Sequence, residues 1–268
     1  NDEIKIRIDH INSIAQDLAT VNKQINTIEI NGSVANELRD KRDVLIDELS
    51  AIVDVSVTED PIYDQTGNET GLYRYIVKIA GGQVLVDQND YNQLECVARS
   101  EKEKVNQTDI DGLYDIRWTH GPDFSLNNAS MGGALKGLVQ MRDGNNGEYF
   151  RGTTTQIVHG GKTSKVTIKT EDAYLSSMMK CNLSDTGGVI NIGNQLYNYT
   201  DWTYEGNGVY TFTIDNVASD EPINATKNNQ LATVGSEIRY QGVPYYMQQM
   251  NEWIREFSAK VNEIFTEG

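Results

Sequence analysis

Apolar residues at a seven-residue spacing near the start of the chain restrict the possible folds most strongly. Two sets recur along this stretch, the second lying three residues after the first: Ile4, Ile11, Leu18 and Ile25, and Ile14, Val21 and Ile28. Such a narrow apolar seam is typical of a helix in a coiled coil or helix bundle. The opposite side is expected to be polar and to include Asn12. Packing within one chain and packing between chains remain equally open from this pattern.

A second helix is predicted to follow a short turn and to end near Ile52. The turn is Asn31-Gly32, and Ser33 is the expected N-cap. The exposed side is expected to carry the charges: Glu37, Arg39, Asp40, Lys41, Arg42, Asp43, Asp47 and Glu48. Arg39 and Asp43 have the spacing of an ion pair on one helix face. Two long helices joined by a short turn should pack antiparallel.

Beyond Val53 the apolar period changes to two, which indicates β-strands. A hairpin is predicted from residues 72 to 86 around Gly81-Gly82, and a further strand at 114–119. The polar stretch 100–111 between them is expected to be a loop or an exposed hairpin tip. Helical spacing returns briefly at residues 130–144.

Short alternating runs separated by glycine-containing turns fill most of the region from Tyr149 to Gly242. The runs are 157–158, 165–169, 189–192, 196–199 and 209–214, and they predict a compact β domain of about 90 residues. A last helix is expected over 243–265, with Pro244 at its start. Its apolar stripe consists of Tyr246, Met250, Trp253, Phe257, Val261 and Ile264.

This order of elements predicts an α+β fold in which one helical bundle is split along the sequence. The bundle would contain long antiparallel helices from both ends of the chain, formed by residues 1–52, 130–148 and 243–268. Two mainly-β domains, 53–129 and 149–242, would be inserted into it.

The charge balance excludes several classes of function. The 268 residues contain 23 Lys and Arg against 39 Asp and Glu, a formal net charge of -16. Nucleic acids and anionic membrane surfaces need clustered cations, so neither is an expected partner. No apolar run approaches the roughly 20 residues of a membrane span. The chain starts at Asn1 without a methionine or a leader, so we expect it to be part of a longer protein.

Sequence motifs for catalysis or metal binding are absent, and we expect no catalytic, cofactor-binding or metal-binding residues and no cofactor. His10, His120 and His159 are widely spaced, and His159-Gly160-Gly161 lacks a nucleophile motif, which favours a turn histidine. Cys96 and Cys181 have no CxxC or histidine neighbours and are interpreted as structural thiols.

Two further patterns admit a functional and a structural interpretation. Asp109, Asp111, Gly112 and Asp115 resemble part of a calcium loop, but ligands at the expected spacing are missing, which favours a solvated turn. The segment 143–147 is similarly turn-like. The β-region aromatic residues Tyr197, Tyr199, Trp202, Tyr204 and Tyr210 could line a glycan groove, although aromatic residues on strands more often pack a core.

Four helical segments resemble the family of hook-associated protein 1 of bacterial flagella, which joins the hook to the filament. Residues 10–25 resemble the family's INxIAxxIAxLNxQI helix, and residues 35–50 its ANxLxDxRDxLxDELS helix. Residues 132–143 resemble GGxLxGLxxxRD, and residues 244–262 resemble the returning YYxxLNxFxxxFAxxxN helix. Residues 149–242 match no family motif, so they are expected to be a lineage-specific insertion.

The resemblance implies a structural protein that acts by subunit packing and not as an enzyme. It implies self-association into a ring in the full-length protein, with the hook protein and the next hook-associated protein on the filament side as partners. An export chaperone and passage through the type III channel to the extracellular flagellum, without a cleaved signal peptide, are also implied.

Three alternatives remain open at this point. The chain could be another flagellin-like axial protein, although those relatives lack the ANxLxDxRD helix at this position. The inserted β domain could be an outward-facing adhesin or glycan-binding module. An enzyme carried on the flagellum would need a cleft with convergent ionisable residues.

Overall fold

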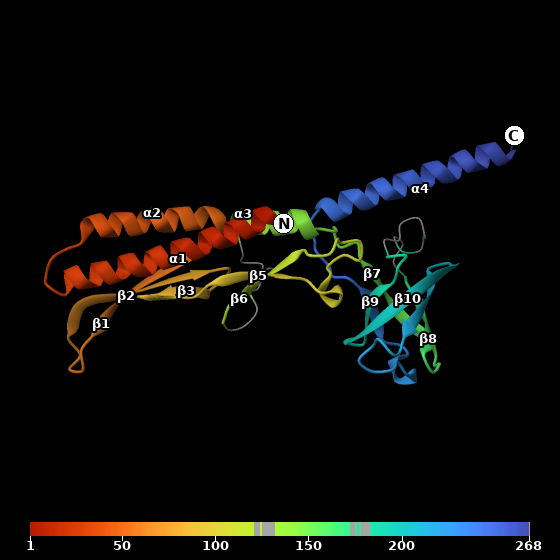
Figure 1. The fold of residues 1–268 in the computed structure, drawn as a ribbon, viewed down its shortest axis with the longest axis horizontal. Helices are drawn as coiled ribbons and strands as arrows, with labels where there is room; N and C mark the ends of the chain where they lie inside the picture. Colours follow the sequence, from red (N-terminus) through yellow and green to blue (C-terminus); the bar gives the residue numbers. More distant parts are fainter. Residues whose placement is uncertain (121–123, 125–131, 172–174, 176, 178–182, 268) are drawn as a thin grey trace. The chain divides into compact units, whose positions relative to one another are not determined.

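The structure is a computed structural model that describes residues 1–120, 124, 132–171, 175, 177 and 183–267 (Figure 1). Helices and strands occur in separate runs along the described chain, so the expected α+β class is confirmed. The chain divides into two compact units. Unit 1 consists of Asn1–Ala98 with Tyr114–Val139, and unit 2 of Arg99–Leu113 with Gln140–Gly268. The finer division into a split bundle and two β domains stays a prediction.

In unit 1, helices α1 (Asp2–Glu29) and α2 (Asn36–Ile52) lie side by side over a sheet (Figure 1). The helices run antiparallel, as expected, because Glu29 near the end of α1 contacts Arg39 near the start of α2. The predicted end of α1 is also confirmed: the helix stops at Glu29, and Gly32 has a φ of +78°.

The sheet beneath these helices is antiparallel, with strands in sequence order. The strands are β1 (Val55–Tyr63), β2 (Glu69–Ile79), β3 (Gln83–Asp87) and β4 (Asp90–Tyr91). The hairpin predicted at 72–86 is β2–β3, with Ile79 opposite Gln83. A separate two-stranded sheet pairs β5 (Leu94–Ala98) with β6 (Tyr114–Trp118).

The core of unit 1 forms where the heptad seam of α1 faces the strands. Ile4, Ile11 and Leu18 are at most 2% exposed and belong to the same cluster as Val77 and Ile79 of β2. Burial of such side chains contributes about 1.5–3 kcal/mol each, before the entropy of ordering is subtracted. The seam is therefore used within the chain as far as Ile25, whereas Ile28 is 37% exposed.

Unit 2 contains a closed six-stranded antiparallel barrel in the region where a β domain was expected, while the bounds of that domain stay a prediction. Its strands are β7 (Phe150–Val158), β8 (Thr163–Lys169), β9 (Gly188–Ile192), β10 (Gln195–Gly206), β11 (Val209–Asp215) and β12 (Leu231–Val234). The strand order around the barrel is β10-β11-β8-β7-β12-β9. Phe150 packs edge-to-face against Tyr210 and Phe212 inside the barrel, with ring centroids 5.1 Å apart in each pair.

The remaining elements of the described residues are two helices and two short 3-10 turns. They are α3 (Gly133–Asp143), α4 (Val243–Glu267), η1 (Glu101–Glu103) and η3 (Ala225–Lys227). Pro244 lies in the first turn of α4, as expected. The apolar stripe of α4 is uncovered in this chain: Trp253 is 64% and Phe257 57% exposed, and Tyr246, Met250 and Ile264 are also exposed. Among the described residues, no helix combines the length and apolar character of a membrane span.

Two expectations about the second helix are wrong. Ser33 is not its N-cap; α2 begins after Ala35, whose backbone N–H donates to the Glu29 carboxylate of α1 at 3.4 Å. Arg39, expected to pair with Asp43, instead binds Glu29 and Glu59. In both cases the partner is a carboxylate from another element, and not the nearby residue, Ser33 or Asp43, that the helix sequence predicts.

Two side chains expected on polar, exposed surfaces are also placed differently. Arg42 is 5% exposed, and the side chain of Asn12 is turned toward β5. Their contacts are described below, because both belong to the helical motifs.

Candidate functional site

Four polar residues within the helical motifs make contacts that fix the packing of neighbouring elements. We call Asn12, Asn22, Arg42 and Asp143 the motif anchors. Asn12, on α1, bonds both backbone groups of Leu94 in β5: its Nδ2 donates to the carbonyl and its Oδ1 accepts from the N–H, each at 2.8 Å. The Asn12 side chain thus satisfies both backbone groups of Leu94, as a neighbouring strand would.

Asn22 and Arg42 join α1, α2 and the large sheet. Asn22 Nδ2 donates to the carbonyl of Gln88 at 2.9 Å, while Asn22 Oδ1 accepts from Arg42 at 3.5 Å. The Arg42 guanidinium lies 3.6 Å from the ring centroid of Tyr75 and reaches Glu59 at 3.3 Å. Stacking on an aromatic face combined with a charged partner is a favourable environment for a buried guanidinium.

A neighbouring ion pair closes the turn between the two helices. Arg39 donates from Nε and Nη2 to the two carboxylate oxygens of Glu29, both at 2.8 Å. These hydrogen bonds lower the pKa of Glu29 despite its partial burial, and they raise the pKa of Arg39. The bidentate geometry fixes the register of α2 against the end of α1.

Asp54, directly after α2, accepts backbone hydrogen bonds from two loops. Its Oδ1 accepts from Gly132 and its Oδ2 from Gly81, both at 3.0 Å. The adjacent Gly133 has a φ of +81°, and a Cβ there would lie 2.5 Å from the Ile52 carbonyl oxygen. The paired glycines of the GGxLxGL motif therefore allow the start of α3 to approach the end of α2 closely.

In unit 2 the chain enters and leaves the barrel through two adjacent segments, residues 143–148 and 235–242, which we call the neck. Asn145 forms an isolated β-bridge with Gln241. The Asn145 side chain is 1% exposed; its Nδ2 donates to the Ser236 carbonyl at 2.8 Å, and its Oδ1 accepts from the Ile238 N–H at 3.0 Å. At Gly144 a Cβ would lie 2.5 to 2.7 Å from backbone atoms of three neighbouring residues.

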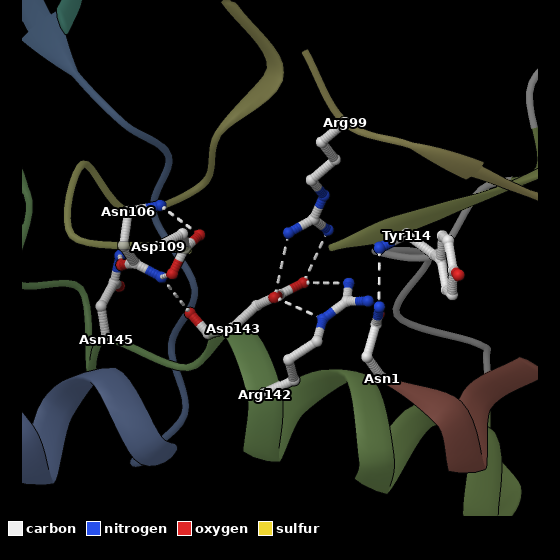
Figure 2. A network of polar contacts seen from close by, with 8 residues as sticks. All are labelled: Asn1, Arg99, Asn106, Asp109, Tyr114, Arg142, Asp143 and Asn145. Carbon is white, nitrogen blue, oxygen red and sulfur yellow. Dashed lines mark hydrogen bonds and ion pairs between the residues drawn. The ribbon is translucent and has the colours of Figure 1, made fainter. Parts of the chain in front are cut away.

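Asp143, the last residue of α3, is the most strongly bound of the motif anchors (Figure 2). Arg99 donates to its two carboxylate oxygens at 3.0 and 2.8 Å, and Arg142 donates to the same two oxygens at 2.7 and 2.8 Å. The side chains of Arg99 and Asp143 are only 5% and 3% exposed. Burial alone would raise the pKa of Asp143, but hydrogen bonds from Arg142 and Arg99 outweigh it and lower the pKa.

Asn106 lies in the 99–113 segment and connects that segment to Asp143 of the ion cluster and to Asn145 of the neck (Figure 2). Its Nδ2 donates to the Asp143 backbone carbonyl at 3.1 Å, and its Oδ1 accepts from Asn145 at 2.9 Å. Asp109 accepts from the backbone and side chain of Asn106, at 2.9 and 3.2 Å. Burial raises the pKa of Asp109, with opposing contributions from these bonds.

Chemically, these contacts fix the arrangement of neighbouring elements. The carboxylate of Asp143 is shared by two guanidinium groups, and the amide of Asn145 is bonded on both its donor and its acceptor side. A general acid or nucleophile needs a reacting atom that a substrate can reach. Asp143 and Asn145 are buried and engaged, so the arrangement supports a packing role.

His159 lies in the connection between β7 and β8, where a turn was expected. Its Nδ1 lies 3.0 Å from the Ile223 carbonyl oxygen, an arrangement that requires Nδ1 to carry the proton. The same atom lies 3.4 Å from Ser164 Oγ, but a protonated Nδ1 cannot accept the hydroxyl proton. Ser164 is also 1% exposed and bonded to Asn216, so the pair cannot act as a nucleophile and base.

The acidic residues that resemble part of a calcium loop are engaged separately. Asp109 bonds Asn106, whereas Asp111 binds Lys104 at 2.9 Å. Asp115 lies on β6. Within the described ranges, no three His, Cys, Asp or Glu side chains form a group that could hold a metal ion.

The β-region aromatic residues pack the barrel core, as the structural interpretation expected. Tyr197, Tyr199 and Tyr210 are at most 2% exposed, and Trp202 and Tyr204 pack against the same cluster. Cys96 lies opposite Ile116 and packs against the core of unit 1. Cys181 lies outside the described residues, so pairing of the two cysteines remains untested.

Several anchoring residues were not predicted from sequence, and one signal could have found Asn22. Asn22 continues the seven-residue series of Ile8 and Ala15, both of which are buried, so a polar residue on an apolar face indicates a buried hydrogen bond. Arg99 and Asn106 carry no comparable signal, because they lie in an irregular polar segment. Their roles depend on distant residues of the neck.

The fold and these contacts define an α+β protein in which polar motif residues bond neighbouring elements within each unit. The family model described as the flagellar hook-associated protein FlgK helical domain matches residues 1–158, more than half of the chain. This chain belongs to that family.

Two further comparisons found similar proteins. A stretch of 65 residues is 38% identical to flagellar hook-associated protein 1 of Bacillus subtilis (strain 168), covering 24% of this chain and 12% of that protein. The solved structure of the flagellar hook junction protein FlgK from Burkholderia pseudomallei is 15% identical, with a TM-score of 0.44 over 91% of this chain and 48% of that one. The chain thus spans less than half the length of either relative.

Proposed function

We propose that this chain is part of a structural component of the bacterial flagellum that joins the hook to the filament and acts by subunit packing, without catalysis. The observation that carries the proposal is the family match over residues 1–158. The contacts of the motif anchors support it, because they hold the elements of each unit in a defined arrangement, as an assembly subunit requires.

The exposed stripe of α4 supports a further part of the proposal. A helix with Trp253, Phe257 and Met250 all more than half exposed buries its apolar face only when another element covers it. We infer that the complete protein covers this stripe and that α4 then joins the other helices in one split bundle. The helical domain would comprise residues 1–52, 130–148 and 243–268.

Ring formation, partners and location follow from the same family assignment. The full-length protein would self-associate into a ring, contacting the hook protein on one side and the next hook-associated protein on the filament side. An export chaperone would accompany it before passage through the type III channel to the outside of the cell, without a cleaved signal peptide. Catalytic residues, metals and cofactors have no part in this function.

The β regions have a secondary role in this proposal. Residues 53–129 and 149–242 would form two inserted domains that face outward, with the barrel as surface decoration. The buried tyrosines of the barrel core leave the alternative of an aromatic glycan groove without support.

Deletion of the full-length gene tests the proposed function. We expect hooks without filaments, flagellin released into the medium and loss of motility, all restored by the wild-type gene. Normal filaments in the deletion strain would refute the junction role.

A variant of the α4 stripe tests its proposed packing. Replacing Trp253 by Glu in the full-length protein should abolish complementation, because a charge would enter an apolar contact. Lys260→Glu on the same helix, where Lys260 is 68% exposed, is the matched control and should complement. Equal complementation by both variants would show that the stripe is not used.

A further inference from the structure

Among the described residues, the buried guanidinium of Arg42 bonds side chains through its terminal nitrogens and not through Nε. Its terminal nitrogens reach Asn22 at 3.5 Å and Glu59 at 3.3 Å, and its flat face covers Tyr75. The Nε–H is buried and has no hydrogen-bond partner among the described residues. Leaving a buried charged donor unsatisfied is costly, and such groups in native proteins usually bond ordered water.

A small cavity lies at the same place. It is lined by Arg42 together with polar side chains of α1, α2 and the sheet, including Asn26, Glu29, Arg39, Glu59 and Gln88. The cavity leaves about 10 Å³ for the centre of a water molecule. That is close to the minimum for one water, and a polar lining is what separates a hydrated cavity from an empty one.

The charges around the cavity favour an uncharged occupant. Two guanidinium groups, Arg39 and Arg42, face two carboxylates, Glu29 and Glu59, so the lining carries no formal net charge. An anion would meet both carboxylates and a cation both guanidinium groups. A water molecule can instead accept from Nε–H and donate to an oxygen of the lining.

We infer that this cavity is the binding site of one ordered water molecule, held by Arg42 Nε and bridging α1, α2 and the sheet. The site gives the arginine of the RD motif a role that lysine cannot fill. A lysine has no Nε–H at this position and no planar group to stack on Tyr75.

The experiment is water-selective NMR on the ¹⁵N-labelled chain. The Nε–H signal of Arg42, assigned through its own side-chain carbons, should exchange slowly and show cross-relaxation with a long-lived water. The Nε–H of Arg39, which donates directly to Glu29 at 2.8 Å, is the matched control and should lack this signal. Absence of the water signal at Arg42, with a shift typical of a direct carboxylate bond, would overturn the inference.

A crystal structure obtained with bromide in place of chloride separates water from an anion. We expect a water-sized peak within about 3.2 Å of Arg42 Nε and no bromide signal there. An anomalous bromide peak at Nε, or an empty cavity, would contradict the proposal. Both readouts use the unmodified chain, so neither depends on a variant that fails to fold.

Discussion

Unit 1 and the barrel differ in the interactions that stabilise each of them. In unit 1 an apolar helix seam packs on a sheet, and a few buried polar side chains, among them Asn22 and Arg42, set how the elements meet. In the barrel, hydrogen bonds join neighbouring strands, and an aromatic cluster around Tyr210 and Phe212 fills the interior. Apolar packing accepts many side-chain combinations of similar volume, whereas a buried polar pair needs particular partners.

The family match is distributed unevenly over the two units. The family model covers all of unit 1 and ends at residue 158, the last residue of the first barrel strand. Four polar residues of the helical motifs, Asn12, Asn22, Arg42 and Asp143, each bond a specific partner. Unit 2 shares one such anchor, Asp143, at the neck where the barrel begins.

The largest predicted effect is loss of that anchor. Asp143→Ala should lower the free energy of unfolding by about 3–5 kcal/mol, because Arg99 and Arg142 are buried and would lose the carboxylate they share. Urea unfolding measures the loss. Asp220→Ala removes the exposed Lys102–Asp220 pair and should cost at most about 1 kcal/mol. Equal costs for both variants would contradict the importance of the neck cluster.

The same cluster predicts a loss of stability in acid. The folded-state pKa of Asp143 is lowered, so the unfolded chain takes up this proton first as the pH falls. The stabilisation is present above the unfolded value of about 4 and disappears as the pH falls through the folded value. Asp143→Ala should remove this part of the acid dependence. An unchanged acid profile would show that Asp143 is not responsible.

A smaller effect is expected within unit 1. Asn22→Ala should cost about 1–3 kcal/mol, since the Gln88 carbonyl loses its donor and Arg42 loses an acceptor. Hydrogen exchange should place the loss in α1 and the strands beneath it. Thr20→Ala, at an exposed position on the same helix, is the control, and a similar cost there would argue against a specific anchor.

The barrel should respond less to loss of a polar contact. Tyr210→Phe removes the hydrogen bond from the hydroxyl to the Leu175 carbonyl at 2.8 Å, while keeping the ring in the core. We expect a cost of about 1 kcal/mol. A loss as large as that of Asp143→Ala would remove the distinction between the two regions.

The smallest effect concerns Asp109 in the segment beside the neck. Burial raises the folded-state pKa of Asp109. Its contribution to the free energy of unfolding is therefore largest below the unfolded pKa of about 4 and decreases as the pH rises through the folded-state pKa. The free energy of unfolding of Asp109→Asn, relative to that of wild type, should therefore be higher at pH 7 than at pH 4. Urea unfolding at both pH values measures this, and a constant difference would contradict it.

Periodicity predicted the elements well where local sequence decides them. The heptads of α1, the hairpin at Gly81-Gly82 and the start of α4 near Pro244 are all present. Closure of the barrel was not predictable, because it depends on β12 pairing with both β7 and β9, and β12 is only four residues long. Arg42 was misplaced for a similar reason: its partners Tyr75 and Glu59 come from strands far along the chain.

We propose that the junction function belongs to the helical part and that the barrel is dispensable. Phe150 and Val234 are register partners at the neck, so residues 150–234 can be replaced by a short Gly-Ser link without separating the ends. Filaments counted by electron microscopy in cells carrying this full-length variant test the claim most directly. We predict filaments at wild-type frequency. Hooks without filaments, despite normal export of the variant, would contradict the account.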